Sequence, residues 1–213
     1  MTTRAYQETY LSKAQSALGD AFDYAICTCH IPGSDFIKLF TVSSVSRRME
    51  NGEPAFLAGK SGIEIVTDII LETTGKQLEI ELQEHFGRSR EYWIGWALCY
   101  YQWFSARSYS DIFAVLAYED LANMYYTLHE ADITKFVDIV DGKIREHFKD
   151  TNLKRIRSSY GCTQAELARR SGVTLRSIQM YEQRNKDINK ASADALYRIS
   201  KVLGCSMESL LEK

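Results

Sequence analysis

Near its end the chain reads Gln164-Ala-Glu-Leu-Ala168-Arg-Arg-Ser-Gly172-Val-Thr-Leu-Arg-Ser-Ile178-Gln-Met-Tyr181-Glu-Gln183. Thr163 followed by Glu166 is a capping box, which predicts a helix that starts at Gln164. Leu167 and the small Ala168 are expected to face inward, where a second helix crosses the first. Gly172 supplies the positive φ that a sharp turn after the first helix needs. The stretch therefore predicts two short helices joined by a tight turn.

The second helix predicts a surface that contacts DNA. Thr174 can cap it, and Ile178 with Tyr181 or Glu182 falls on its buried side at helical spacing. The side chains that then project outward are Thr174, Leu175, Arg176, Gln179 and Met180. A helix that presents Arg and Gln in this way suits the major groove, where these side chains recognise base edges. The stretch is interpreted as a helix-turn-helix that reads DNA.

The pattern T-Q-x-E-L-A-x-x-S-G-V-x-x-x-x-I-x-x-Y-E resembles the Cro/CI-type (Xre family) helix-turn-helix class of phage repressors. The resemblance covers about residues 152–212. Before the pattern, Leu153, Ile156 and Arg157 form an expected first helix that ends at Gly161. After it, an expected fourth helix closes at Gly204, and Ser206 caps a last one. The resemblance implies a five-helix, lambda-repressor-like domain at the C-terminal end of an all-α chain.

The resemblance also implies a role for each matching residue. The base-reading positions are Thr174, Leu175, Arg176, Gln179 and Met180. The positions expected near DNA phosphates are Gln164, Ser177, Arg184, Asn185 and Lys186. The family has a glycine after the recognition helix, where this chain has Arg184 or Asn185. Arg157 and Glu182 match a pair that joins the first helix to the end of the third, so we expect a largely buried bidentate ion pair.

Charge divides the chain into two parts. Residues 151–213 hold 12 Lys/Arg and 6 Asp/Glu, a net charge of +6, whereas residues 1–150 hold 14 and 22, a net charge of −8. A basic module on an acidic body suits a protein with one end that faces DNA. The 5 cysteines, an odd number without framework spacing, are typical of reduced thiols in a cytosol. No apolar run reaches membrane length and the start is polar, so a cytoplasmic protein is expected.

The rest of the chain predicts a helical body. Residues 4–29 have an apolar stripe that predicts one long helix, which stops at Ile31-Pro32-Gly33. Further helices are expected from Ser61 to Gly75, from Ser89 onward, and over about 110–117, 119–128 and 132–148. Residues 76–86 alternate in polarity and are interpreted as an extended linker, with a short strand as the alternative. The expected domains are a helical region 1–75, an aromatic-rich body 76–150 and the DNA-binding domain 151–213.

The pattern of residues 34–52 is similar to the two helices and turn of the C-terminal module. Ser34 or Asp35 could cap a first helix, Thr41-Val-Ser43 could form a turn, and residues 44–52 could form a second helix. The segment is a candidate degenerate second helix-turn-helix. The favoured interpretation is a pair of short packing helices with a surface pair of arginines, because short motifs of this kind arise often by chance.

Other motifs support catalysis or ligand binding less well. Gly59-Lys60-Ser61 lacks the glycine that a phosphate loop needs at residue 54, so Ser61 is better explained as a helix cap. Cys27-Thr-Cys29-His30 has no second ligand pair at zinc spacing, so no metal and no cofactor are expected. Residues 92–126 hold 12 of the aromatic residues, which favour a packed core, with a partner surface as the alternative. No catalytic constellation is present, and an enzyme is not expected.

Two functions follow from these observations. The first is a transcriptional regulator, most simply a repressor, which binds double-stranded DNA as a homodimer because one module contacts only one half-site. The second is implied by the resemblance alone. It is an antitoxin-like protein whose acidic, aromatic N-terminal body binds a partner protein while the C-terminal domain represses its own operon.

Overall fold

The computed structural model describes residues 4–78, 87–148 and 150–212, and these residues are helical without a strand. The all-α fold class is therefore confirmed for the described part of the chain. Two compact units are present, Met1–Ile144 and Arg145–Lys213. The first unit spans the expected region 1–75 and most of the expected region 76–150, whose residues 145–150 fall in the second unit. The alternating residues 79–86 lie outside the described residues, so neither the linker nor the strand interpretation is addressed.

The N-terminal unit is built from eight α-helices and three shorter turns among its described residues. The α-helices are α1 (Leu11–Asp23), α2 (Gly33–Val42), α3 (Ser44–Glu50), α4 (Gly62–Thr74), α5 (Arg90–Ser105), α6 (Tyr109–Phe113), α7 (Tyr118–Leu128) and α8 (Ile133–His147), the last of which continues into the next unit. The turns are η1 (Glu8–Tyr10), a 3-10 turn, and the π turns η2 (Tyr24–Thr28) and η3 (Ala55–Gly59).

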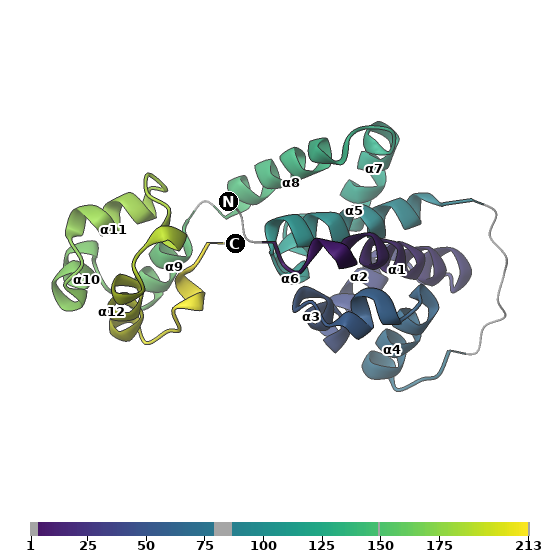
Figure 1. Cartoon of the computed structure of the whole chain (residues 1–213), viewed down its shortest axis with the longest axis horizontal. Helices are drawn as coiled ribbons and strands as arrows, with labels where there is room; N and C mark the ends of the chain where they lie inside the picture. The colour runs from purple at the N-terminus through teal and green to yellow at the C-terminus, as the bar shows by residue number, and fades with distance from the viewer. Residues whose placement is uncertain (1–3, 79–86, 149, 213) are drawn as a thin grey trace. The chain divides into compact units, whose positions relative to one another are not determined.

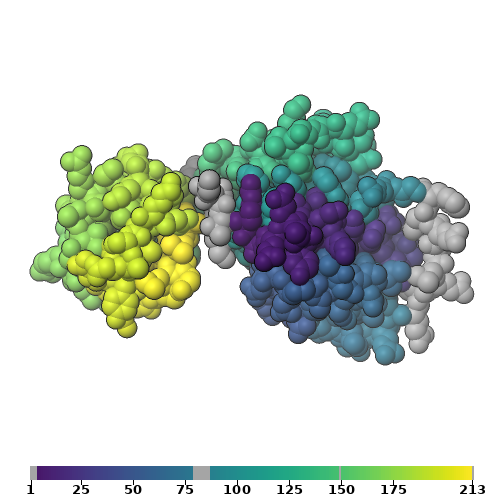
Figure 2. Space-filling model, in the orientation of Figure 1, coloured from purple at the N-terminus to yellow at the C-terminus, as the bar shows by residue number. Residues whose placement is uncertain are grey.

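Helix α1 is the centre of this unit and packs along α5. In Figures 1 and 2 the purple N-terminal segment lies between the blue residues of α2–α4 and the teal residues of α5. Gly19 and Gly95 allow the two helices to approach closely, because a Cβ on Gly95 would collide with the backbone of Leu18. Ala14, Leu18 and neighbouring apolar residues of α1 are fully buried in this contact.

The long helix predicted for residues 4–29 is divided into η1, α1 and η2. The chain breaks near Ile31 as expected. However, the next helix begins at Gly33 with Pro32 as its N-cap, so the caps predicted at Ser34 or Asp35 are wrong. Proline suits this place because its φ of −55° is compatible with the start of a helix and its missing N–H would have no helical partner.

Helix α4 begins as the sequence predicts. Ser61 and Glu64 form a complete capping box, and Gly75 closes the helix with a φ of 71°. Lys60, which precedes the helix, forms an ion pair with Asp68 of α4. The Gly59-Lys60-Ser61 sequence is therefore the approach to a capped helix, which agrees with the preferred interpretation over the phosphate loop.

Helix α5 carries the aromatic concentration, and it is buried on several sides. Tyr101 is fully buried, its hydroxyl donates to Asp141 at 2.6 Å, and its ring meets Phe136 of α8 edge-on at 6.3 Å. Trp93 meets the same Phe136 ring at 5.7 Å. Tyr92 and Trp103 are buried as well, so three rings of α5 belong to the core of the unit, and Trp93 packs at its edge. Trp96, Tyr100 and Phe104 are half-buried.

A buried carboxylate links α5 to two neighbouring segments. Glu91 accepts hydrogen bonds from Arg90 at 2.7 Å, from the Tyr118 hydroxyl at 2.9 Å and from the Cys27 thiol at 3.6 Å. Burial raises the pKa of Glu91, but the bonds from Arg90 and Tyr118 lower it more, so its pKa lies below the usual value. Burial and the nearby Glu91 carboxylate raise the pKa of the Cys27 thiol to about 11.

Two properties of the described residues bear on wider function. They contain no group of three or more His, Cys, Asp or Glu side chains placed to hold a metal ion. Within residues 4–78, 87–148 and 150–212, none of the helices is long and apolar enough to cross a membrane.

Candidate nucleic-acid interface

The second unit contains four of the five helices that the sequence predicts, and a 3-10 turn stands where the fifth was expected. They are α9 (Asn152–Ser159), α10 (Gln164–Ser171), α11 (Leu175–Glu182) and α12 (Ala193–Leu203), with the 3-10 turns η4 (Ile188–Lys190) and η5 (Glu208–Leu210). The last predicted helix is thus a single 3-10 turn. The core of the second unit is formed by Leu153, Leu167, Ile178, Ile199, Leu210 and their apolar neighbours.

Local capping sets the ends of α10 and α11. Thr163 and Glu166 form a capping box at the start of α10, with the Thr163 N–H donating to Glu166 at 2.8 Å. These hydrogen bonds lower the pKa of the Glu166 carboxyl. Gly172 ends α10 with a φ of 67°, and Thr174 then caps α11 by accepting the Ser177 N–H at 3.2 Å. Helix α11 therefore has a defined start and direction.

The inner side of α11 is anchored in the core of the domain. Ile178 is fully buried, Tyr181 is 5% exposed and Glu182 is 8% exposed. Leu167 of α10 is also fully buried, and Ala168 packs against the same cluster. A helix held on one side in this way presents its other side to solvent in a fixed orientation.

The outer side of α11 carries the five residues predicted to read bases. Thr174, Leu175 and Arg176 are exposed, and Gln179 and Met180 are partly exposed. None of them is enclosed by the domain. The Thr174 hydroxyl contacts the Ser177 hydroxyl at 2.9 Å in addition to its capping bond, so its polar atom is engaged within the helix terminus. Arg176, Gln179, Leu175 and Met180 are therefore the side chains available for contact with bases.

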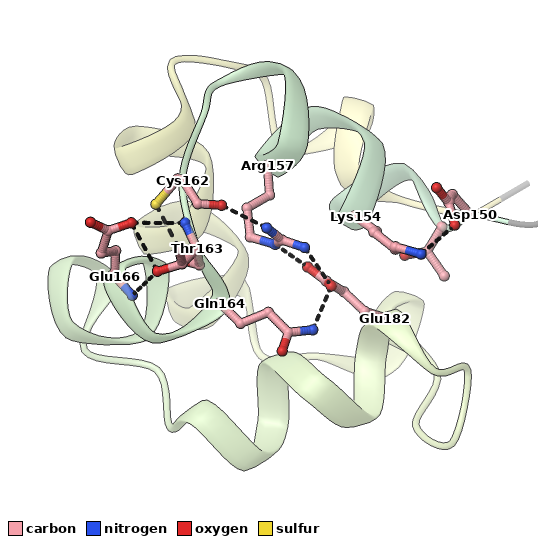
Figure 3. Close-up of polar contacts among 9 residues, drawn as sticks. Asp150, Lys154, Arg157, Cys162, Thr163, Gln164, Glu166 and Glu182 are labelled. Carbon is pink, nitrogen blue, oxygen red and sulfur yellow. Dashed lines mark hydrogen bonds and ion pairs between the residues drawn. The ribbon is translucent and has the colours of Figure 1, made fainter.

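The predicted partners Arg157 and Glu182 form a bidentate ion pair (Figure 3). The Arg157 Nε donates to Glu182 Oε1 at 2.6 Å and Nη2 donates to Oε2 at 3.0 Å. Arg157 Nη1 also donates to the Cys162 carbonyl at 2.6 Å. The side chain of Glu182 is 2% exposed and that of Arg157 is 13% exposed. Its bonds to Glu182 raise the pKa of the Arg157 guanidinium, so Arg157 stays charged. It ties α9 to the end of α11.

Gln164, a predicted phosphate contact, also joins this pair. Its amide Nε2 donates to Glu182 Oε2 at 2.7 Å, as Figure 3 shows. The carboxylate thus accepts bonds from two helices besides its own. Sequence reasoning missed this bond, because Gln164 and Glu182 are separated by 18 positions and no local pattern connects them.

The loop after α11 contains the remaining predicted phosphate contacts. Arg184 has a φ of 58°, so it occupies the left-handed conformation for which the family uses glycine. Its guanidinium donates to the Phe148 carbonyl at 3.1 Å and to Glu212 at 3.4 Å. Asn185 and Lys186 are exposed, and the Lys186 ammonium lies 5.2 Å from the centre of the Tyr181 ring. Arg184 thus links the loop after α11 to Phe148 and Glu212, whereas Asn185 and Lys186 face solvent.

The segment 34–52 differs from this arrangement. Only Ser43 separates α2 from α3, whereas three residues separate α10 from α11. The backbone N–H and hydroxyl of Ser44 donate to the Glu72 carboxylate at 2.7 and 2.8 Å. An acidic side chain at the start of α3 opposes a DNA phosphate there. These features agree with the favoured interpretation of this segment, two packing helices.

The comparisons with known proteins address the C-terminal domain. A model of the family described as "Helix-turn-helix" matches residues 153–210. No curated protein matches the chain. No solved structure matches it either.

Proposed function

Residues 153–210 are a helix-turn-helix domain of the Cro/CI (Xre) type, which implies DNA binding, and on this premise we propose that the chain is a sequence-specific transcriptional repressor. The observation that carries the proposal is the outer side of α11. This side includes the at least partly exposed residues Arg176, Gln179, Leu175 and Met180. On the opposite side, Ile178 is buried in the core. This is the arrangement that a recognition helix needs in the major groove.

Each exposed side chain of α11 has a chemistry that matches a base edge. The Arg176 guanidinium matches the two acceptors of guanine, O6 and N7. The Gln179 amide matches the donor and acceptor of adenine. Leu175 and Met180 offer apolar contact to a thymine methyl group. We propose that these four side chains determine sequence preference, and that Thr174 contributes by starting the helix in the right direction.

Phosphate contacts are proposed on either side of α11. Asn185 and Lys186 are exposed beyond its end, and Ser177 lies in its first turn. The backbone N–H groups at the start of α10, beside Gln164, suit a phosphate as well. Because Gln164 and Arg184 already bond to protein groups, we propose that they act mainly by holding the surface in shape.

We further propose that the protein acts as a homodimer and as a binding protein rather than an enzyme. One module of this kind contacts one half-site, and two modules related by symmetry double the contact area. The N-terminal unit is the natural place for dimerisation, since half-buried Trp96, Tyr100 and Phe104 remain on the outer part of α5.

A second candidate function is an antitoxin-like protein. Its support is the charge of −8 on residues 1–150, carried by 22 Asp/Glu against 14 Lys/Arg, which favours a basic protein partner. In that case the N-terminal unit neutralises the partner and the C-terminal domain represses the shared operon. Co-expression with the product of a neighbouring reading frame, followed by purification of the complex, distinguishes the two functions.

Selection of bound fragments from the source genome tests the main proposal. Arg176→Ala is expected to cost about 1–3 kcal/mol on the selected site and to relax preference at one base position. The matched change Lys186→Ala should weaken binding to all duplexes equally and reduce the salt slope by about one unit. A reporter gene downstream of the selected site shows whether binding represses. Absence of any enriched sequence, or equal behaviour of the two variants on all sequences, contradicts the proposal.

A further inference from the structure

A second charged surface lies on the C-terminal domain, formed by the end of α9, the last turn of α10 and the middle of α12. We call it the α10–α12 patch, and it consists of Tyr160, Arg169, Arg170, Tyr197, Arg198 and Lys201. All six residues are exposed. In Figure 1, α11 lies along the upper edge of this domain and α12 along the lower edge. No residue of the patch belongs to α11, whose outer side carries the residues proposed to read bases.

The patch is hollowed on both sides of Arg170. A hollow of about 470 Å³ is lined by Arg170, Tyr197, Arg198, Lys201 and two neighbours. A second hollow of about 200 Å³ lies on the other side and is lined by Arg170, Tyr160, Arg169 and three neighbours. The surface thus offers depressions, with cations at their walls, in which side chains of a partner fit.

One cation of the patch is paired with a carboxylate. Glu166 lies near two others, Arg169 and Arg170, whose charges add to the hydrogen bonds from Thr163 in lowering its pKa but form no ion pair with it. Arg198 forms an ion pair with Asp194 on its own helix. Glu166 lines the smaller hollow, but its carboxylate accepts from the Thr163 N–H and hydroxyl in the capping box. Within the described residues, Arg169, Arg170 and Lys201 make no ion pair with a carboxylate. These three cations are available to an anionic ligand.

The two tyrosines hold cations in place. The Arg170 guanidinium donates to the Tyr160 hydroxyl at 3.2 Å and lies 5.4 Å from the centre of the Tyr160 ring. The Lys201 ammonium lies 5.4 Å from the centre of the Tyr197 ring. Cations held in this way lose less conformational freedom when a ligand binds. A preorganised set of cations therefore binds an anionic ligand more tightly than a freely moving set does.

The tyrosines also decide which class of anion fits. Tyr160 is 47% exposed and Tyr197 52% exposed, so both present large apolar surfaces beside the cations. Contacts with duplex phosphates need cations and hydrogen-bond donors but gain little from exposed rings. Tyrosine together with arginine is typical of the anchor residues of protein interfaces. The combination favours a polypeptide over a second DNA segment.

We propose that the α10–α12 patch binds a carboxylate-rich segment of a partner protein. Arg170 and Lys201 donate hydrogen bonds to carboxylates across the larger hollow, Arg169 donates to another at the smaller hollow, and the two tyrosine rings pack against the apolar parts of the same segment. This contact does not require the outer side of α11. The domain is therefore able to hold a protein partner and DNA on separate surfaces.

Fluorescence anisotropy with the full-length chain tests the proposal without DNA. The probes are a fluorescein-labelled oligoglutamate peptide and an oligoglutamine peptide of the same length. The chain is expected to bind the first and not the second. The double variant Arg170→Ala/Lys201→Ala should weaken oligoglutamate binding about tenfold. Tyr197→Ala should weaken it as well, although no charge is removed.

A matched control separates the patch from net charge. Arg155→Ala/Lys190→Ala removes two exposed cations of the same domain outside the patch, and it should change peptide binding by less than about twofold. Circular dichroism melting of every variant verifies folding. Equal weakening by both double variants, or failure to bind oligoglutamate, overturns the proposal. If Arg170→Ala/Lys201→Ala instead weakens binding to a random duplex, the patch is a DNA surface and the proposal is also overturned.

Discussion

The ion pair between Arg157 and Glu182 is the contact whose loss should most weaken the C-terminal domain. Glu182→Gln keeps the shape of the side chain but removes its charge and one acceptor oxygen. In the native domain the carboxylate accepts bonds at 2.6, 3.0 and 2.7 Å, the first two from Arg157 and the third from Gln164. The amide NH2 of the variant would face the N–H donors of Arg157 and Gln164 in a buried position, where no hydrogen bond can form between them.

The magnitude follows from how deeply the pair is buried. Breaking a buried pair by removing one partner costs about 3–5 kcal/mol. The lower end applies here, because the Arg157 side chain is 13% exposed and keeps its bond to the Cys162 carbonyl. We therefore expect a loss of about 3 kcal/mol in the free energy of unfolding, or roughly 10–20 °C in Tm for a domain of this size.

The three tryptophans make the assay specific, because Trp93, Trp96 and Trp103 all lie on α5 of the N-terminal unit. Far-ultraviolet circular dichroism follows helices of both units, whereas tryptophan fluorescence follows the N-terminal unit alone. Glu182→Gln should lower the Tm of the C-terminal domain. This change appears in the dichroism signal but not in the tryptophan fluorescence. Gln183→Ala, an exposed neighbour, should change stability by less than about 0.5 kcal/mol. A loss below about 1 kcal/mol for Glu182→Gln, or a shift confined to the fluorescence signal, would refute the reasoning.

Four further predictions concern other parts of the chain. Thr163→Ala removes the capping oxygen at the start of α10 and should destabilise the C-terminal domain by about 1 kcal/mol in the dichroism transition. Gly95→Ala should cost about 3 kcal/mol in the fluorescence transition, because its Cβ would meet the backbone of α1. Gly142→Ala on α8 has open space around the new methyl group, so that variant should be neutral or gain up to about 1 kcal/mol. The lowered pKa of Glu91 means that its stabilising effect is complete above the unfolded pKa of about 4.3 and is lost as pH falls through the lower folded pKa. Acid unfolding followed by tryptophan fluorescence should therefore be steeper in the native protein than in Glu91→Gln, and equal slopes would contradict the assignment.

The sequence by itself determined the local features of the C-terminal domain. The start of α10 at Thr163, its end at Gly172 and the end of α12 at Gly204 could all be predicted, because caps and turns depend on residues within about four positions. The exposed side of α11 followed from the spacing of Ile178 and Tyr181, since helical periodicity separates an inner from an outer face. The same reasoning misplaced the start of α2, where Pro32 rather than a polar side chain begins the helix.

Only the tertiary structure decided where several polar side chains of that domain are used. Gln164 bonds to Glu182, and Arg184 bonds to the Phe148 carbonyl across 36 positions. The α10–α12 patch likewise brings Arg170 and Lys201 to one hollow from two helices. Contacts between residues so far apart depend on how the helices pack, and packing is a property of the whole core rather than of any short stretch. The same holds for the close approach of α1 and α5, which Gly95 permits but does not predict.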